Sequence, residues 1–76
     1  MGSEESKKQR EQTSGRVEEM LPQGQFLVRL VDGRGIRAMV ARESRPVVVK
    51  IIPGDRVVLE LYPLDETRGV IVRKIV

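Results

Sequence analysis

Cysteine and histidine are both absent from this 76-residue sequence. The lack of cysteine excludes disulfide bonds and thiolate metal sites, and the lack of histidine would leave a zinc or haem site to be built from carboxylates alone. We therefore expect no metal and no cofactor. The absence of cysteine also suits a reducing cytoplasm, which is the location we expect.

Aromatic side chains and long apolar runs are scarce as well. Phe26 and Tyr62 are the only aromatic residues, whereas sequence-tolerant binders of single strands usually stack bases on several rings. This scarcity disfavours a cold-shock or single-strand-binding role. No apolar run approaches the ~20 residues that cross a bilayer, and the N-terminal lysines precede no apolar stretch of the kind found in secretory signals. We expect a soluble protein with no membrane partner.

A change in composition divides the chain near residue 15. Residues 1–14 contain one apolar side chain, Met1, among Glu, Lys, Gln and Ser. Such a segment cannot bury enough surface to offset the entropy of ordering it, so we predict a disordered tail over 1–14 and one folded domain over 15–76. The tail holds three basic and three acidic side chains, so the formal net charge of +3 belongs to the domain. That excess suits a phosphate-rich partner.

From Gly15 onward, short apolar runs alternate with turn residues, and no long stretch has helical periodicity. Asp32-Gly33 is a strong hairpin signal because both residues tolerate positive φ. Five runs have strand character, namely 17–21, 26–31, 35–40, 57–61 and 70–76. The side chains that we expect to face the interior alternate along these runs: Phe26, Val28, Leu30, Ile36, Ala38, Val40, Val57, Leu59 and Leu61.

The connections between the later runs are less regular. Residues 41–45 could form one helical turn that Pro46 ends, and residues 47–52 have β propensity but could also plug the bottom of a barrel. We interpret residues 62–69 as a polar connection. Five strands with an insertion after the third fit the OB fold, an all-β, five-stranded Greek-key barrel with a short helical turn between strands 3 and 4. An SH3-like barrel has a similar strand count and stays open as an alternative.

Catalytic constellations are not evident, and we expect a binding protein rather than an enzyme. The serines have no histidine to activate them. The adjacent acids Glu18-Glu19 and Asp65-Glu66 do not face one reacting centre. Gly33-Arg34-Gly35 lacks the full spacing of a glycine-rich phosphate loop.

Three segments carry a family resemblance. The stretch Gly15-Arg-Val-Glu-Glu-Met-Leu-Pro-Gln-Gly-Gln-Phe-Leu-Val-Arg-Leu-Val-Asp-Gly33 resembles the opening of bacterial and plastid translation initiation factor one. Ile51-Ile-Pro-Gly-Asp-Arg-Val57 is similar to the Ile-Leu-x-Gly-Asp-Lys-Val of that family, and Tyr62-x-x-Asp65-x-x-Arg68-Gly69 is similar to its following motif. The similarity needs no gaps from Gly15 to Lys74.

The resemblance implies a specific role. Members of the family are OB-fold proteins that catalyse nothing and bind the decoding region of the small ribosomal subunit, in the aminoacyl-tRNA site, in cooperation with initiation factors two and three. We expect a monomer. The rRNA contacts of the family come from basic side chains of the loop after strand three and of the barrel rim. By position, the resemblance assigns rRNA contacts to Arg45, Lys50, Arg68 and Lys74. We add Arg42, which stands at a usual glycine of the family and restores charge to the loop, and a possible additional basic rim of Arg34, Arg37 and Arg73.

The loop after the third strand departs from the family pattern. Glu43 and Pro46 stand where the family usually has lysine, Val47-Val48 replaces polar or aromatic residues, and Val70 replaces an arginine. Each lost phosphate contact lowers the affinity and flattens its salt dependence. Two other functions therefore stay open: a divergent or redesigned OB-fold domain that acts as a weak RNA-binding or protein-interaction module, and an RNA-chaperone-like barrel.

Overall fold

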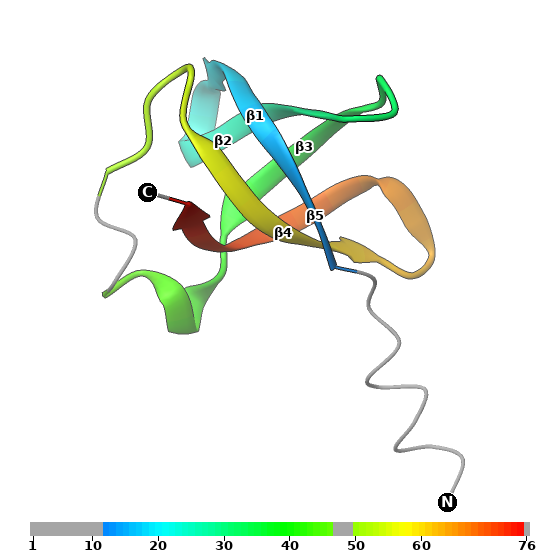
Figure 1. Ribbon diagram of the computed structural model, residues 1–76. Helices are drawn as coiled ribbons and strands as arrows, with labels where there is room; N and C mark the ends of the chain where they lie inside the picture. Colours follow the sequence, from blue (N-terminus) through cyan, green and yellow to red (C-terminus); the bar gives the residue numbers. More distant parts are fainter. Residues whose placement is uncertain (1–11, 47–49, 76) are drawn as a thin grey trace, which may run out of the picture.

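The computed structural model describes residues 12–46 and 50–75, whose backbone forms a closed barrel (Figure 1). The strands are β1 (Gln12–Leu21), β2 (Gln25–Leu30), β3 (Gly35–Val40), β4 (Arg56–Tyr62) and β5 (Asp65–Ile75). Two 3-10 turns, η1 (Pro22–Gly24) and η2 (Arg42–Ser44), follow β1 and β3. The prediction of a five-stranded all-β fold with a short helical turn between the third and fourth strands is confirmed.

The order of strands around the barrel is β1-β2-β3-β5-β4, and β1 closes it by pairing with both β2 and β4. The β3–β5 pair is parallel, and the other pairs are antiparallel. This closed order, with η2 between β3 and β4, is that of an OB fold, so the SH3-like alternative does not apply. Closure pairs the edges of strands whose valines would otherwise invite association.

The β2–β3 hairpin has the predicted register but a different turn. Val28 lies opposite Ile36, as the alternation requires. The Leu30 N–H donates to the Arg34 carbonyl over 2.9 Å, so the loop contains Val31, Asp32 and Gly33, and of these Gly33 alone has positive φ, at 95°. This is a three-residue loop with glycine in the left-handed region, not the two-residue turn that the Asp-Gly pair indicated.

The β4–β5 hairpin corrects the expected connection over residues 62–69. The structure has a tight turn at Pro63-Leu64, and β5 already begins at Asp65, opposite Tyr62. The Asp65 carboxylate holds this start by accepting hydrogen bonds from the Thr67 N–H (3.1 Å) and the Thr67 hydroxyl (2.6 Å). The polar side chains belong to the exposed start of a strand, which a search for apolar residues mistakes for a loop.

Glycine at position 69 is required by close packing within β5. A Cβ there would lie 2.6 Å from the Glu60 carbonyl oxygen, closer than real Cβ atoms approach a backbone. Gly69 lies inside β5, opposite Leu61, rather than at the end of the polar connection expected over residues 62–69.

Strand β1 begins at Gln12, three residues before the boundary that composition indicated. Gln12, Thr13 and Ser14 lie opposite Glu60, Leu59 and Val58 of β4. The Gln12 amide also donates to the Glu60 carboxylate over 3.1 Å. Backbone pairing with β4 orders these polar residues, and composition carries no sign of such a nonlocal partner. Of the tail predicted over residues 1–14, residues 1–11 lie outside the described residues.

The interior of the barrel is aliphatic. Its buried cluster consists of Val17, Val28, Leu30, Ile36, Ala38, Ile51, Val57, Leu59, Leu61 and Ile71. Phe26 and Val40, expected in the core, are partly buried and pack against this cluster. Burial of each large aliphatic side chain stabilises the fold by about 1.5–3 kcal/mol relative to exposure. Ile51 reaches this cluster from outside any strand, so its side chain fills part of the barrel, while residues 47–49 of the same segment lie outside the described residues.

Candidate nucleic-acid interface

The turn η2 presents two of the expected rRNA-binding residues. Arg42 and Arg45 are exposed, while Ala41 and Ser44 beside them are buried. The Ala41 N–H donates to the Ile71 carbonyl of β5 over 2.9 Å, and the Ser44 N–H donates to the Ala41 carbonyl over 2.9 Å. These two bonds fix the turn against the barrel, so the arginine stems start from a defined backbone. Val47 and Val48, where the sequence departs from the family, lie outside the described residues.

The end of the same loop is fastened to the barrel by Lys74. Its ammonium group donates to the Lys50 carbonyl over 3.1 Å and forms an ion pair with Asp55 at 3.2 Å. The backbone N–H of Ile52 and, to a smaller extent, Lys74 hold the pKa of Asp55 below its usual value. Lys50 itself is exposed. Lys74 therefore ties the loop end to β5, whereas Lys50 is open to a partner.

Arg37 and Arg68 form a second exposed basic pair. They lie opposite each other in the parallel β3–β5 pair, and like charges in such positions repel. The Arg68 guanidinium lies 5.9 Å from the centre of the Tyr62 ring, a cation–π distance. From Arg37 the chain reaches Arg42 in five residues, at most ~17 Å of extended backbone. Arg37 is therefore close to η2 along the chain, and Arg68 lies beside Arg37 across the β3–β5 pair.

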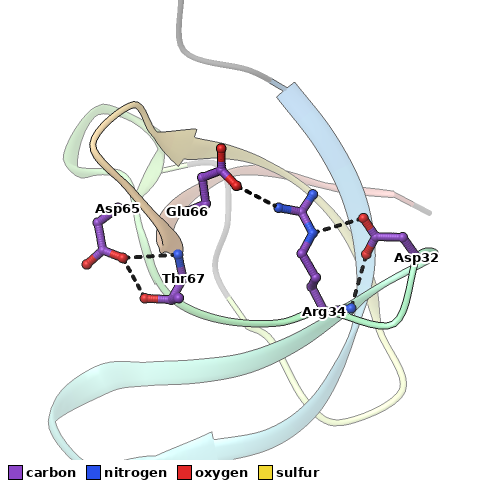
Figure 2. Close-up of polar contacts among 5 residues, drawn as sticks. All are labelled: Asp32, Arg34, Asp65, Glu66 and Thr67. Carbon is purple, nitrogen blue, oxygen red and sulfur yellow. Dashed lines mark hydrogen bonds and ion pairs between the residues drawn. The ribbon is translucent and has the colours of Figure 1, made fainter.

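Arg34 is occupied by acids. Its Nε donates to Asp32 over 2.9 Å, and its guanidinium reaches Glu66 at 3.4 Å, which links the β2–β3 loop to the start of β5 (Figure 2). The Arg34 N–H also donates to Asp32 and is the main cause of the lowered pKa of that carboxyl. An RNA phosphate would have to compete with both carboxylates for this side chain.

Other arginines on the outer surface were not singled out by the sequence. Arg16 of β1 lies opposite both Arg29 of β2 and Arg56 of β4, and all three are exposed. Arg73, expected on the rim, is exposed on β5 opposite Val58. The sequence does not predict that Arg16 lies opposite Arg29, because the β1–β2 register shifts at the bulge at Glu18. It does not predict that Arg16 lies opposite Arg56 either, because these strands pair only when the barrel closes.

Other kinds of site are not apparent in the part of the chain that the structure describes. Residues 12–46 and 50–75 contain no group of three or more acids that could hold a metal ion. In the same residues, no helix is long and apolar enough to cross a membrane. A closed OB barrel whose connecting loops and rim carry exposed arginines defines the class: a binding protein for nucleic acid.

Comparisons with known proteins give the family within this class. The family model of translation initiation factor 1A / IF-1 matches residues 3–76, and the chain belongs to this family. The solution structure of translation initiation factor one from the Wolbachia endosymbiont strain TRS of Brugia malayi is similar to it, with a TM-score of 0.74 and 31% sequence identity over 100% of this chain and 90% of that chain. The protein is thus a translation initiation factor, and its family implies binding to the small ribosomal subunit.

Proposed function

We propose that this factor binds the decoding region of the small subunit, in the aminoacyl-tRNA site, and there assists assembly of the initiation complex. The observation that carries the proposal is the geometry of η2, which holds Arg42 and Arg45 exposed on a turn hydrogen-bonded to β5. Neither guanidinium has an acidic partner within residues 12–46 and 50–75. Guanidinium groups bind phosphate oxygens in bidentate fashion, which suits folded rRNA.

The other expected rRNA-binding residues differ in whether their charged groups are free to contact RNA. Lys50 and Arg68 are exposed and available to phosphate, and Arg37 lies opposite Arg68 in the β3–β5 pair. Lys74 contributes indirectly, because it fixes the backbone that carries Lys50. We further propose that the factor works as a monomer in the cytoplasm, together with initiation factors two and three.

We also propose that the factor acts by binding alone. A general acid needs a pKa near the working pH, but the described carboxyls with a shifted pKa are all shifted downward, because each accepts hydrogen bonds from neighbouring donors. They are Glu18, Asp32, Asp55 and Asp65. These groups are ionised at neutral pH and serve as structural acceptors.

Sedimentation with purified small subunits at several salt concentrations tests the main proposal. Replacing Arg42 and Arg45 by glutamine removes two phosphate contacts and should reduce the slope of log affinity against log salt by about 1.5–2. The R42K/R45K variant keeps both charges and should keep the slope. Chemical probing of the decoding nucleotides should show protection by the intact chain. Equal slopes for the intact chain and R42Q/R45Q would refute the role of η2.

The alternative of a protein-interaction module has its own observation. Tyr62, Pro63, Leu64 and Val70 line an apolar surface pocket at the β4–β5 hairpin, and Leu64 is 99% exposed. Apolar and aromatic side chains of this kind are enriched at the centres of protein interfaces. If an L64S variant lost ribosome association while R42Q/R45Q kept it, protein contact through this hairpin would replace RNA contact through η2 as the function.

A further inference from the structure

Three arginines form a row across the outer face of β2, β1 and β4. Arg16 is the middle member, with Arg29 directly opposite on one side and Arg56 directly opposite on the other. Directly opposite residues in antiparallel strands project from the same face, about 4.5–5.5 Å apart at Cβ. The same three side chains line one shallow surface pocket together with Ser14, Gly15 and Val31. Register and surface shape therefore agree that the row is a single patch.

The positive charge of this row is only partly compensated. Arg29 forms two hydrogen bonds with the Glu18 carboxylate, at 3.0 and 3.1 Å. Within residues 12–46 and 50–75, Arg16 and Arg56 have no acidic partner. Since like charges in directly opposite positions destabilise a sheet, this arrangement costs stability in the free protein.

The nearby acids are already engaged elsewhere. Asp32, next to Val31 in the chain, binds Arg34, and Asp55, next to Arg56, binds Lys74. Neither carboxylate is available to neutralise the row. An external anion would relieve the repulsion that the fold leaves in place.

We propose that Arg16 and Arg56 form a second RNA-binding surface, which contacts the phosphate backbone of folded RNA independently of η2. Arg29 borders this surface, with its guanidinium held by Glu18 and the Gly33 carbonyl. The chemistry of the patch favours phosphate over a protein partner. Three guanidinium groups surround a hollow whose other walls are Ser14, Gly15 and the single apolar Val31, whereas the centre of a protein interface is usually apolar or aromatic. The guanidinium forks of Arg16 and Arg56, which lie directly opposite each other, can bind successive phosphates of one strand.

The position of the row gives the factor two separate RNA-facing surfaces. The residues of η2 belong to the link between β3 and β4, while the row crosses β2, β1 and β4. Figure 1 shows β1 and β4 side by side, with η2 below them at the end of β3. Small-subunit RNA would thus be held by a loop and by a strand face together. The contact with small-subunit RNA rests on the proposed function. The test therefore also measures binding to an RNA that is not part of the ribosome.

The test compares R16Q/R56Q with the charge-retaining control R16K/R56K. Binding is measured from 50 to 200 mM salt, to purified small subunits and, separately, to a short RNA duplex. The glutamine variant should lose about 1.5–2 of the salt slope, so that the ratio of intact to variant affinity is about tenfold larger at 50 mM than at 200 mM salt. The lysine control should keep the slope. R16Q/R56Q should have a melting temperature at or above that of the intact chain, because the repulsion between the two charges is removed. R16K/R56K should melt at the temperature of the intact chain, because that repulsion is kept.

The outcomes separate this inference from the proposed function. If R16Q/R56Q keeps the full slope on both RNAs, the row does not contact RNA and the inference fails, whatever R42Q/R45Q does. If the intact chain binds the duplex through the row but does not bind small subunits, the inference stands and the proposed function fails. If R16Q/R56Q loses binding to polyglutamate but not to either RNA, the partner is an acidic protein and the inference is overturned.

Discussion

The interior of the barrel and the link between β3 and β4 are stabilised in different ways. Ten buried aliphatic side chains, contributed mostly by the strands, stabilise the interior cooperatively. The link depends on a few separate polar contacts: the Ala41 N–H bonded to β5, the Lys74 ammonium bonded to the Lys50 carbonyl, and the Lys74–Asp55 ion pair. Loss of one interior contact should therefore weaken the whole fold, whereas loss of one link contact should change the loop and spare the barrel. Binding residues can vary on such a link at little cost to folding.

The largest effect should come from the interior. Leu59 is fully buried between β1 and β5, at 0% exposure. L59A should lower the free energy of unfolding by about 2–5 kcal/mol, because it removes transfer energy and leaves a cavity. Denaturant titration measures this loss. Ribosome affinity corrected for the folded fraction should be unchanged, and a changed affinity would mean that interior and link are not separable.

The second prediction concerns the close approach of β4 and β5. G69A places a Cβ against the Glu60 carbonyl, and the strands must separate to admit it. We expect a loss of about 1–3 kcal/mol from overpacking, measured by thermal unfolding. The matched control is G24A, where a Cβ meets nothing within 4 Å but φ is +73°; its cost should come from backbone strain alone and be smaller. Equal losses of stability in G69A and G24A would show that the close approach of β4 and β5 is not the reason for glycine at position 69.

A smaller effect should come from the link and should depend on pH. The pKa of Asp55 is lowered in the folded state by the Ile52 N–H and then by Lys74. A lowered folded pKa gives stability that is complete above the unfolded value of about 3.8 and is lost as the pH falls through the folded value. The D55N variant should therefore melt lower than the intact chain at pH 7, and the difference should shrink as the pH falls below about 4.

The same variant tests the link directly. Because Asp55 holds both Ile52 and Lys74, D55N should weaken small-subunit binding more than its change in melting temperature would suggest. The matched control is D65N, which removes the charge of the carboxylate that accepts from Thr67 at the β4–β5 hairpin, away from the link. If D65N weakens binding as much as D55N, the link is not the element that positions the binding residues.

The smallest effect should be a gain. Replacing Arg16 by glutamine removes the charge that faces both Arg29 and Arg56. Relief of like-charge repulsion across strands should raise the free energy of unfolding by about 0.2–1 kcal/mol at low salt, and less at high salt. Chemical denaturation at two salt concentrations measures the gain. A loss of stability would indicate that the arginine stem contributes more by packing than its charge costs.

Local alternation predicted much of the barrel interior, although Val17, Ile51 and Ile71 were not among the side chains expected to face inward. Val28, Ile36 and Leu59 were placed correctly because a strand with one buried face has a period of two. The starts of β1 and β5 were missed because Gln12 and Asp65 are polar and become strand residues only by pairing with β4. Such pairing is nonlocal and leaves no sign in a short window of sequence.

The binding residues could be predicted only in part. The family resemblance pointed to Arg45, and the charge of the loop pointed to Arg42; the structure places both exposed, at the start of η2 and directly after it. The resemblance could not reveal that Lys74 binds Asp55 and the Lys50 carbonyl, since these groups meet only after the barrel forms. The row of Arg16 and its two neighbours was missed for the same reason, because adjacency across strands depends on the bulge at Glu18 and on closure.

The parallel pairing of β3 with β5 has a consequence for the order of folding. β1, β2 and β3 follow one another through short turns, and β4 and β5 form a second hairpin, so each half can form from contacts close in sequence. The β1–β4 and β3–β5 pairs, by contrast, join residues far apart in the chain, and closing such loops slows folding. The β3–β4 link is the tether between the two halves. Since doubling a loop costs only about 0.6 kcal/mol, lengthening this tether should delay the meeting of the halves while leaving their final stability almost unchanged.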